Sequence, residues 1–126
     1  MKTIIKTDHA PAPIGPYNQA VLAGNTLYLS CQIALNPTNG HLILDTLENE
    51  TEQVMKNLKA VLDSAGMTFE NVVKTSIFLT DMNNFAKVNT IYGNYFNSEN
   101  APARETIAVA GLPKSVNVEI SMIAVK

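Results

Sequence analysis

The chain has 126 residues, and its 9 Lys and Arg against 11 Asp and Glu give a formal net charge of −2 at pH 7. A chain of this length forms about one domain whose core needs no disulfide scaffold, so we expect residues 1–126 to fold as a single domain. The lack of like-charged blocks disfavours nucleic acid as a ligand, and the longest apolar runs fall short of the roughly 18 residues that a membrane helix needs.

Two features predict a cytoplasmic protein. The apolar run after Met1 is too short for a secretion signal, and the single cysteine, Cys31, has no intramolecular partner. Residues 3–7 favour a short strand. Residues 11–16 contain three prolines and a glycine, and they favour a stiff loop because proline fixes φ and donates no hydrogen bond. This loop delivers Tyr17 to a fixed position.

Residues 18–23 and 26–33 are expected to form two strands, joined by a tight hairpin turn at Gly24-Asn25. Alternation predicts two faces for the second strand, with Leu27, Leu29 and Cys31 on one and Tyr28, Ser30 and Gln32 on the other. The face with the polar residues is either solvated or the floor of a pocket. Cys31 is expected to be a buried, inert thiol, because no histidine is identifiable as its base.

Residues 45–65 predict an amphipathic helix. Asp45 and Glu48 are spaced as an N-cap and its reciprocal partner, and Gly66 is suited to end the helix. The apolar stripe that would pack on a sheet consists of Val54, Leu58, Val61, Leu62 and Ala65.

Residues 72–80 are rich in β-branched side chains and predict a strand that is buried on at least one side. A second helix is expected to begin at residues 81–83. Its apolar stripe, typical of a core, consists of Phe85, Val88, Tyr92, Tyr95 and Phe96. Asn89 lies one residue off this stripe, where it either caps, bonds the core or reaches a partner.

The C-terminal region predicts an antiparallel hairpin whose turn contains residues 111–113. In a symmetric hairpin centred between residues 111 and 112, Arg104 lies opposite Glu119, and directly opposed Cβ atoms are roughly 4.5–5.5 Å apart. One interpretation of this pair is an exposed salt bridge worth roughly 0–1 kcal/mol. In the last strand Glu119 shares a face with Ile123 and Val125.

The order of elements predicts an α+β fold in which a mixed sheet of about six strands carries two helices on one face. The opposite face, with Ile123 and Val125 beside Glu119, has no intramolecular cover, which often signals association. His9 and His41 have no other metal-ligating side chain at suitable spacing, and we expect both to be ordinary surface residues.

Several separated motifs together resemble the RidA/YjgF family of enamine/imine deaminases over nearly the whole chain. In chain order these motifs are residues 10–17 (Ala-Pro-Ala-Pro-Ile-Gly-Pro-Tyr), Ser30-x-Gln32-Ile33, Val73-Lys74-Thr75, Val88-Asn89 with Tyr92, Pro102-Ala103-Arg104, Ala110-x-Leu112-Pro113 and Val118-Glu119-Ile120. The resemblance implies a chorismate-mutase-like fold and homotrimers with a ligand cleft between neighbouring subunits. It also implies hydrolysis of 2-imino acids, formed from enamines such as 2-aminoacrylate and 2-aminocrotonate, to 2-oxo acids and ammonia, with no metal or organic cofactor.

The same resemblance implies roles for individual residues. Arg104 would hold the substrate carboxylate through two parallel hydrogen bonds. Glu119 would position and polarise the attacking water. Tyr17, Ser30 and Asn89 match other cleft positions and suit substrate orientation.

The chain departs from the family pattern at four positions. Cys31 replaces a glycine, Ala101 replaces a phenylalanine, Glu105 replaces a small residue, and Thr106 stands where several members carry cysteine. Alternation directs Thr106 towards Arg104 and Glu105 away from it. Cys31 and Thr106 are therefore expected to line the substrate pocket, with Cys31 narrowing it, and the preferred imine stays open.

Two other functions compete with the deaminase. A trimer of this kind could be a sensor that binds small carboxylates without catalysis. Relatives have also been described as ribonucleases or translation inhibitors, although the acidic balance of the chain disfavours RNA.

Overall fold

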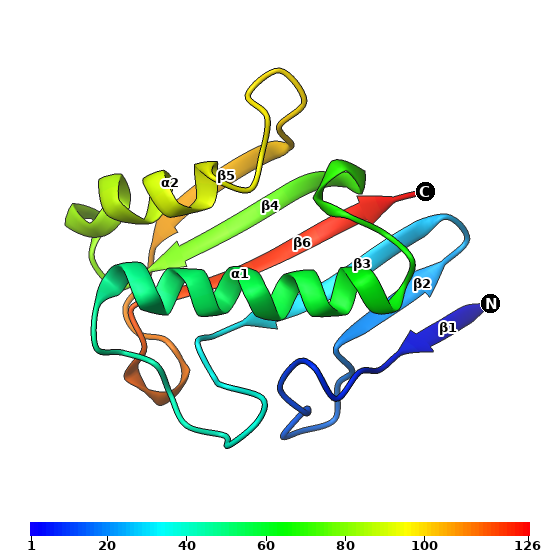
Figure 1. The fold of residues 1–126 in the computed structure, drawn as a ribbon, viewed down its shortest axis with the longest axis horizontal. Coiled ribbons are helices and arrows are strands. Elements are labelled where there is room, and N and C mark those ends of the chain that lie inside the picture. The colour runs from blue at the N-terminus through cyan, green and yellow to red at the C-terminus, as the bar shows by residue number, and fades with distance from the viewer.

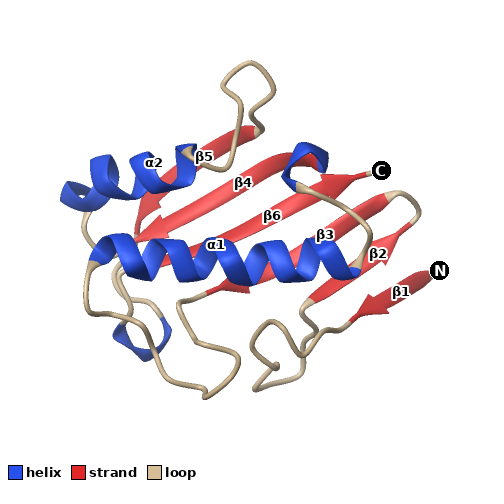
Figure 2. Ribbon diagram, viewed as in Figure 1, coloured by secondary structure: helices blue, strands red, loops and turns tan.

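Six strands form one mixed sheet, and two α-helices lie on one of its faces (Figure 1 and Figure 2). The structure is a computed structural model that describes all residues 1–126. The strands lie in the order β1-β2-β3-β6-β4-β5. The elements are β1 (Lys2–Ile5), β2 (Ala20–Ala23), β3 (Thr26–Gln32), α1 (Leu47–Ser64), β4 (Val72–Leu79), α2 (Phe85–Gly93), β5 (Ala103–Ala108), β6 (Val118–Val125) and the 3₁₀ turns Phe69–Asn71, Met82–Asn84 and Pro113–Ser115. The predicted α+β fold is confirmed. Neither helix combines the length and hydropathy of a membrane span.

The long helix α1 follows the predicted stripe but begins at a different cap. Thr46 is the N-cap, and its hydroxyl accepts a hydrogen bond from the Asn49 amide at 3.0 Å. Asp45, which the sequence favoured as the cap, accepts from the Asn49 side chain instead at 2.9 Å. All five residues of the predicted stripe are buried in the core. Gly66 has a φ of +71°, as a residue that ends a helix in the left-handed region should.

The predicted C-terminal hairpin is wrong. β5 pairs with β4 in parallel, whereas β6 lies between β3 and β4 and is antiparallel to both. The helix between β4 and β5 makes these two strands a βαβ unit, which requires parallel strands. Residues 109–117 then carry the chain past β4 to the middle of the sheet. The central position suits β6 because its alternate residues Val118, Ile120, Met122 and Ala124 are all buried.

A β-bulge changes the predicted faces of β3. The register with β6 shifts between Leu29 and Gln32, so strict alternation ends there. As a result Gln32 is buried and Cys31 is exposed, the reverse of their predicted sides. The expectation of a buried Cys31 is therefore wrong.

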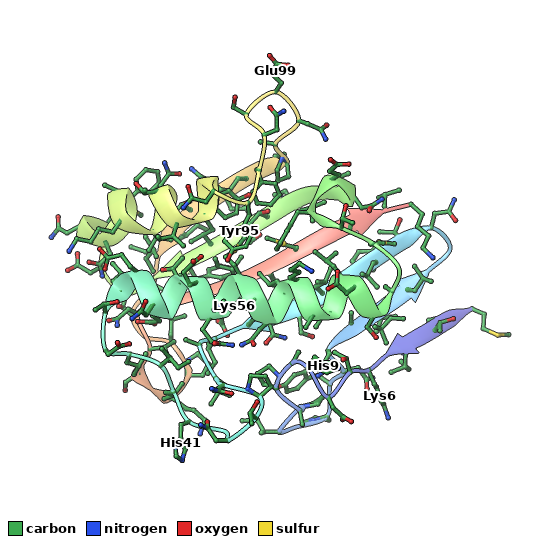
Figure 3. All side chains as sticks on the ribbon, in the orientation of Figure 1. Lys6, His9, His41, Lys56, Tyr95 and Glu99 are labelled. Atoms are coloured by element: carbon green, nitrogen blue, oxygen red, sulfur yellow. The ribbon has the colours of Figure 1, made fainter.

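The predicted stripe of α2 divides into three environments, because Phe85 is exposed at the start of the helix and Tyr95 and Phe96 lie beyond its end. Val88 and Tyr92 are buried in the core. Tyr95 and Phe96 pack edge-on against Phe69, with ring centroids 5.2 and 5.4 Å apart. Tyr95 lies between α1 and α2 in Figure 3, and its hydroxyl donates to Glu52 of α1 at 2.7 Å, which joins α1 to the segment that follows α2.

The sheet face opposite the helices has no cover within the chain, as predicted. Ile4, Val21, Tyr28 and Ile123 are neighbours in register across β1, β2, β3 and β6, and so they form one row. Tyr28 is 51% exposed. We call this row the apolar row of the open face.

Candidate active site

A cavity of about 460 Å³ opens at one end of the sheet, and Glu119 of β6 lies in its wall. Three segments supply the rest of the lining: residues 11–19, residues 30–35 and the turn before β6. We call this the Glu119 cavity. It contains Tyr17, Ser30 and Cys31, three of the residues that the sequence predicted to contact the substrate.

The first wall of the cavity is fixed by buried Gln19. Its side-chain oxygen accepts from the Thr7 amide at 2.8 Å, and its Nε2 donates to the carbonyls of Thr7, Ala10 and Pro11 at 3.0, 3.2 and 2.9 Å. The chain that enters loop 11–16, which has too few donors for regular structure, thereby gains a fixed position at Ala10 and Pro11. The Ser30 hydroxyl donates to the carbonyl of Asn18 at 2.5 Å, so it holds the same loop.

The electrostatics of the cavity favour protonated side chains. Burial raises the pKa of Glu119 above its ordinary value. Desolvation by the surrounding wall also raises the pKa of the Cys31 thiol, and the nearby Glu119 carboxylate raises it further, while a hydrogen bond with Ser121 lowers it in part. Cys31 is therefore a neutral thiol at pH 7 rather than a nucleophilic thiolate.

The turn Pro113–Ser115 brings a cation to the cavity. Lys114 lines the cavity, and Lys114 and Ser115 have φ values of 56° and 57°. Side chains other than glycine rarely adopt this left-handed region, which stores strain in the backbone. No pattern in the sequence predicts this left-handed conformation.

A second group of candidate residues surrounds Arg104 on the helix side of β5. The guanidinium donates to Asn89 Oδ1 at 2.7 Å. It lies 5.6 Å from the ring centroid of Phe85 and 5.1 Å from that of Tyr92, within the range of cation–π attraction. Thr106 lies beside this group with a buried hydroxyl oxygen that has no hydrogen-bond partner. We call these five residues the Arg104 cluster.

Sequence reasoning assigned Phe85 and Tyr92 to the core and so missed their contact with Arg104. Phe85 is 38% exposed, while Tyr92 is buried and donates from its hydroxyl to Thr75 at 3.0 Å. One signal was available. Phe85 and Tyr92 flank Asn89 at spacings of four and three residues, and side chains at such spacings share a helix face.

Arg104 and Glu119 do not face each other. Arg104 pairs in register with Thr75, and Glu119 with Phe78, so the two lie on opposite faces of the sheet with β4 between them. Their backbones are separated by two inter-strand spacings across the sheet and by three residues along the strands, which is roughly 10 Å in each direction. The Glu119 cavity and the Arg104 cluster are thus two separate half-sites within one chain.

Neither residue has an ionic partner. The salt bridges of the structure join Lys59 to Asp63 at 2.7 Å and Lys74 to Glu105 at 3.0 Å. Glu105 points away from Arg104, as predicted, and also accepts a hydrogen bond from Ser76. The hydrogen bond from Ser76, followed by that from Lys74, holds the pKa of Glu105 below its ordinary value.

No group of three or more His, Cys, Asp and Glu side chains is arranged to hold a metal ion. His9 and His41, both exposed, lie at the periphery in Figure 3.

Comparison with known proteins agrees with the motifs. Residues 7–126 match the family model described as Endoribonuclease L-PSP, which represents the RidA/YjgF proteins. The chain belongs to the RidA/YjgF family. The human protein named 2-iminobutanoate/2-iminopropanoate deaminase is 44% identical over 126 residues, covering 100% of this chain and 91% of that protein.

Solved structures of family members have the same fold. A Rid family protein from Yersinia pestis is 47% identical, with a TM-score of 0.96 over 100% of both chains. RidA from an Antarctic Psychrobacter is 40% identical, with a TM-score of 0.94 over 98% of this chain and 99% of that one. The RidA-like topology of β1 to β6 therefore extends over the whole chain.

Proposed function

We propose that this protein hydrolyses 2-imino acids to 2-oxo acids and ammonia, in clefts that each combine the Glu119 cavity of one subunit with the Arg104 cluster of a neighbour. The observation that carries the proposal is the Glu119 carboxylate, which lines a cavity, has no ionic partner and has a pKa raised by burial. A carboxylate whose pKa is shifted towards neutrality is a better general base than an ordinary surface glutamate. The deaminase names of the mammalian relatives support this reaction.

Arg104 has the properties of a receptor for the substrate carboxylate. Asn89, Phe85 and Tyr92 fix its guanidinium, yet no carboxylate of the chain pairs with it. A planar guanidinium with free N–H groups binds a carboxylate through two parallel hydrogen bonds. The orphaned Thr106 hydroxyl is an additional donor at the same place.

A homotrimer would bring the half-sites together. In the single chain Ile4 and Tyr28 of the apolar row are exposed, while Val21 and Ile123 are half-buried. Burying their remaining apolar area against other copies stabilises association by roughly 25 cal/mol per Å². Arg104 lies on the edge strand β5, where a neighbouring subunit can approach it. The separation of Arg104 from Glu119 within one chain supports a cleft shared between subunits.

The reaction then needs only these side chains and water. Arg104 holds the carboxylate so that the imine carbon lies near Glu119. Glu119 accepts a proton from water as the water oxygen bonds to the imine carbon, and it passes this proton to the imine nitrogen to give a neutral carbinolamine. The hydroxyl proton of the carbinolamine is then transferred to its amino group, the C–N bond breaks to release ammonia, and the oxygen forms the carbonyl of the 2-oxo acid. The reaction consumes one water and releases one ammonia, and the substrate carboxylate does not react.

The test is formation of 2-oxo acid and ammonia from an imine that an amino acid oxidase generates in situ, measured against spontaneous hydrolysis. Three-carbon and four-carbon imines should both be consumed faster with the protein, and Glu119→Gln should remove most of the acceleration. Binding of a 2-oxo acid without any acceleration would instead indicate a carboxylate sensor. RNA cleavage that survives both Arg104→Ala and Glu119→Gln would indicate a separate ribonuclease function.

A further inference from the structure

Glu50 is a fully buried carboxylate that the reaction above does not use. It lies in the first turn of α1 and has 0% exposure. A buried carboxylate is strongly unfavourable unless hydrogen-bond donors compensate it. The donors that compensate Glu50 therefore determine why a carboxylate is tolerated at this position.

All hydrogen-bond partners of the Glu50 carboxylate lie at the start of β6. Oε2 accepts from the backbone amides of Asn117 and Val118 at 2.8 and 3.2 Å, and Oε1 accepts from the Asn117 side chain at 2.7 Å. β6 begins at Val118, and Glu119 follows immediately. The carboxylate of Glu50 therefore fixes the backbone directly before the general base.

The chain needs such an anchor at this point. The preceding turn, Pro113–Ser115, contains two residues with left-handed φ, and such strain persists only where surrounding contacts hold it. The carbonyl of Asn117 accepts from the Thr80 amide at 3.2 Å. Asn117 is thus held by Thr80, directly after β4, on one side and by Glu50 of α1 on the other.

We propose that Glu50 is a positioning residue for Glu119, which fixes the start of β6 so that the Glu119 carboxylate meets the attacking water at the correct place. This inference rests on the proposed function, in which Glu119 is the general base. A displacement of about 1 Å in a reacting group costs up to about 10²-fold in rate. Glu50 acts through the backbone and does not touch the substrate.

The hydrogen bonds of Glu50 indicate whether its length or its charge is required for positioning Glu119. Glutamine has the same reach, and its Oε1 can accept from the two backbone amides while its Nε2 donates to Asn117 after the Asn117 amide turns over. Aspartate keeps the negative charge but is one methylene shorter, so it cannot reach the same amides. Reach and acceptor geometry are required, and the charge is not.

The test compares kcat and KM for imine hydrolysis in the intact protein with Glu50→Asp, Glu50→Gln and Glu119→Gln. Glu50→Asp should lower kcat by about 10- to 100-fold with KM within about two-fold, because Arg104 still binds the carboxylate. Glu50→Gln should keep kcat within about three-fold. Val61→Ala is the matched control, since Val61 is buried in the same helix about 16 Å along its axis and should lower thermal stability without lowering kcat.

Each other outcome is decisive. Wild-type kcat in Glu50→Asp, an equal loss in Glu50→Gln, or an equal loss in Val61→Ala would overturn the positioning role while Glu119→Gln stays inactive. Full turnover in Glu119→Gln would overturn both the positioning role and the proposed function.

Discussion

Replacing Ile123 with lysine should separate the subunits without unfolding them. Ile123 lies in the apolar row of the open face, next to Tyr28 on β3 and Lys74 on β4. Full burial of an isoleucine side chain contributes roughly 1.5–3 kcal/mol. Ile123 is already half-buried in the single chain, so association gains about half of that, or roughly 2–4.5 kcal/mol for three copies per trimer. The new ammonium would also face Lys74, and like charges directly opposed in a sheet are unfavourable.

This loss corresponds to roughly two to three orders of magnitude in the association constant, at about 1.4 kcal/mol for each factor of ten. Sedimentation velocity at micromolar concentration should find a trimer for the wild-type chain and a monomer for Ile123→Lys. Ser64→Lys adds the same side chain at an exposed position on α1 and should remain trimeric. A trimeric Ile123→Lys, or a monomeric wild-type protein, would refute the argument that the open face is the interface.

Four further predictions concern the cleft. Arg104→Ala should weaken 2-oxo acid binding in calorimetry as well as turnover, and Arg104→Lys should rescue little because an ammonium has no bidentate fork; undiminished binding would contradict this role. Glu119→Gln should lower kcat by about 10²–10⁴-fold with binding retained. Burial raises the pKa of Glu119, so kcat/KM of the wild-type protein should fall as the pH decreases through an apparent pKa above that of an ordinary glutamate. An apparent pKa at or below the ordinary value would contradict the role of Glu119 as the general base. Cys31→Gly should widen the range of imines accepted in competition assays, and unchanged specificity would show that the thiol does not face the substrate.

Local patterns in the sequence were sufficient to predict the main helices and strands. The stripe of α1 and the β-branched run of β4 follow from spacing and residue type, which act over a few neighbouring residues. The observed N-cap of α1 is Thr46, one residue after the predicted Asp45. Residue spacing does not show which of two adjacent side chains has the geometry to accept the capping hydrogen bond.

Strand pairing was not predictable from the same patterns. The order of β5 and β6 suggested a hairpin, but pairing depends on the whole sheet, in which β6 is more completely buried than β5 and takes the central position. The bulge at Cys31 is also a property of the pair β3 and β6 rather than of either sequence. The consequence for the candidate site is large, because Arg104 and Glu119 move from one hairpin to two half-sites.

The shared cleft is tested most directly by mixing two inactive variants. Arg104→Ala and Glu119→Gln subunits should each form inactive trimers. Trimers refolded from an equal mixture should regain activity in about a quarter of their clefts, since random assembly around a closed ring pairs an intact Arg104 with an intact Glu119 of the neighbour at that frequency. Mixed trimers verified by native mass spectrometry that stay inactive would contradict a cleft in which one subunit supplies Glu119 and its neighbour supplies Arg104.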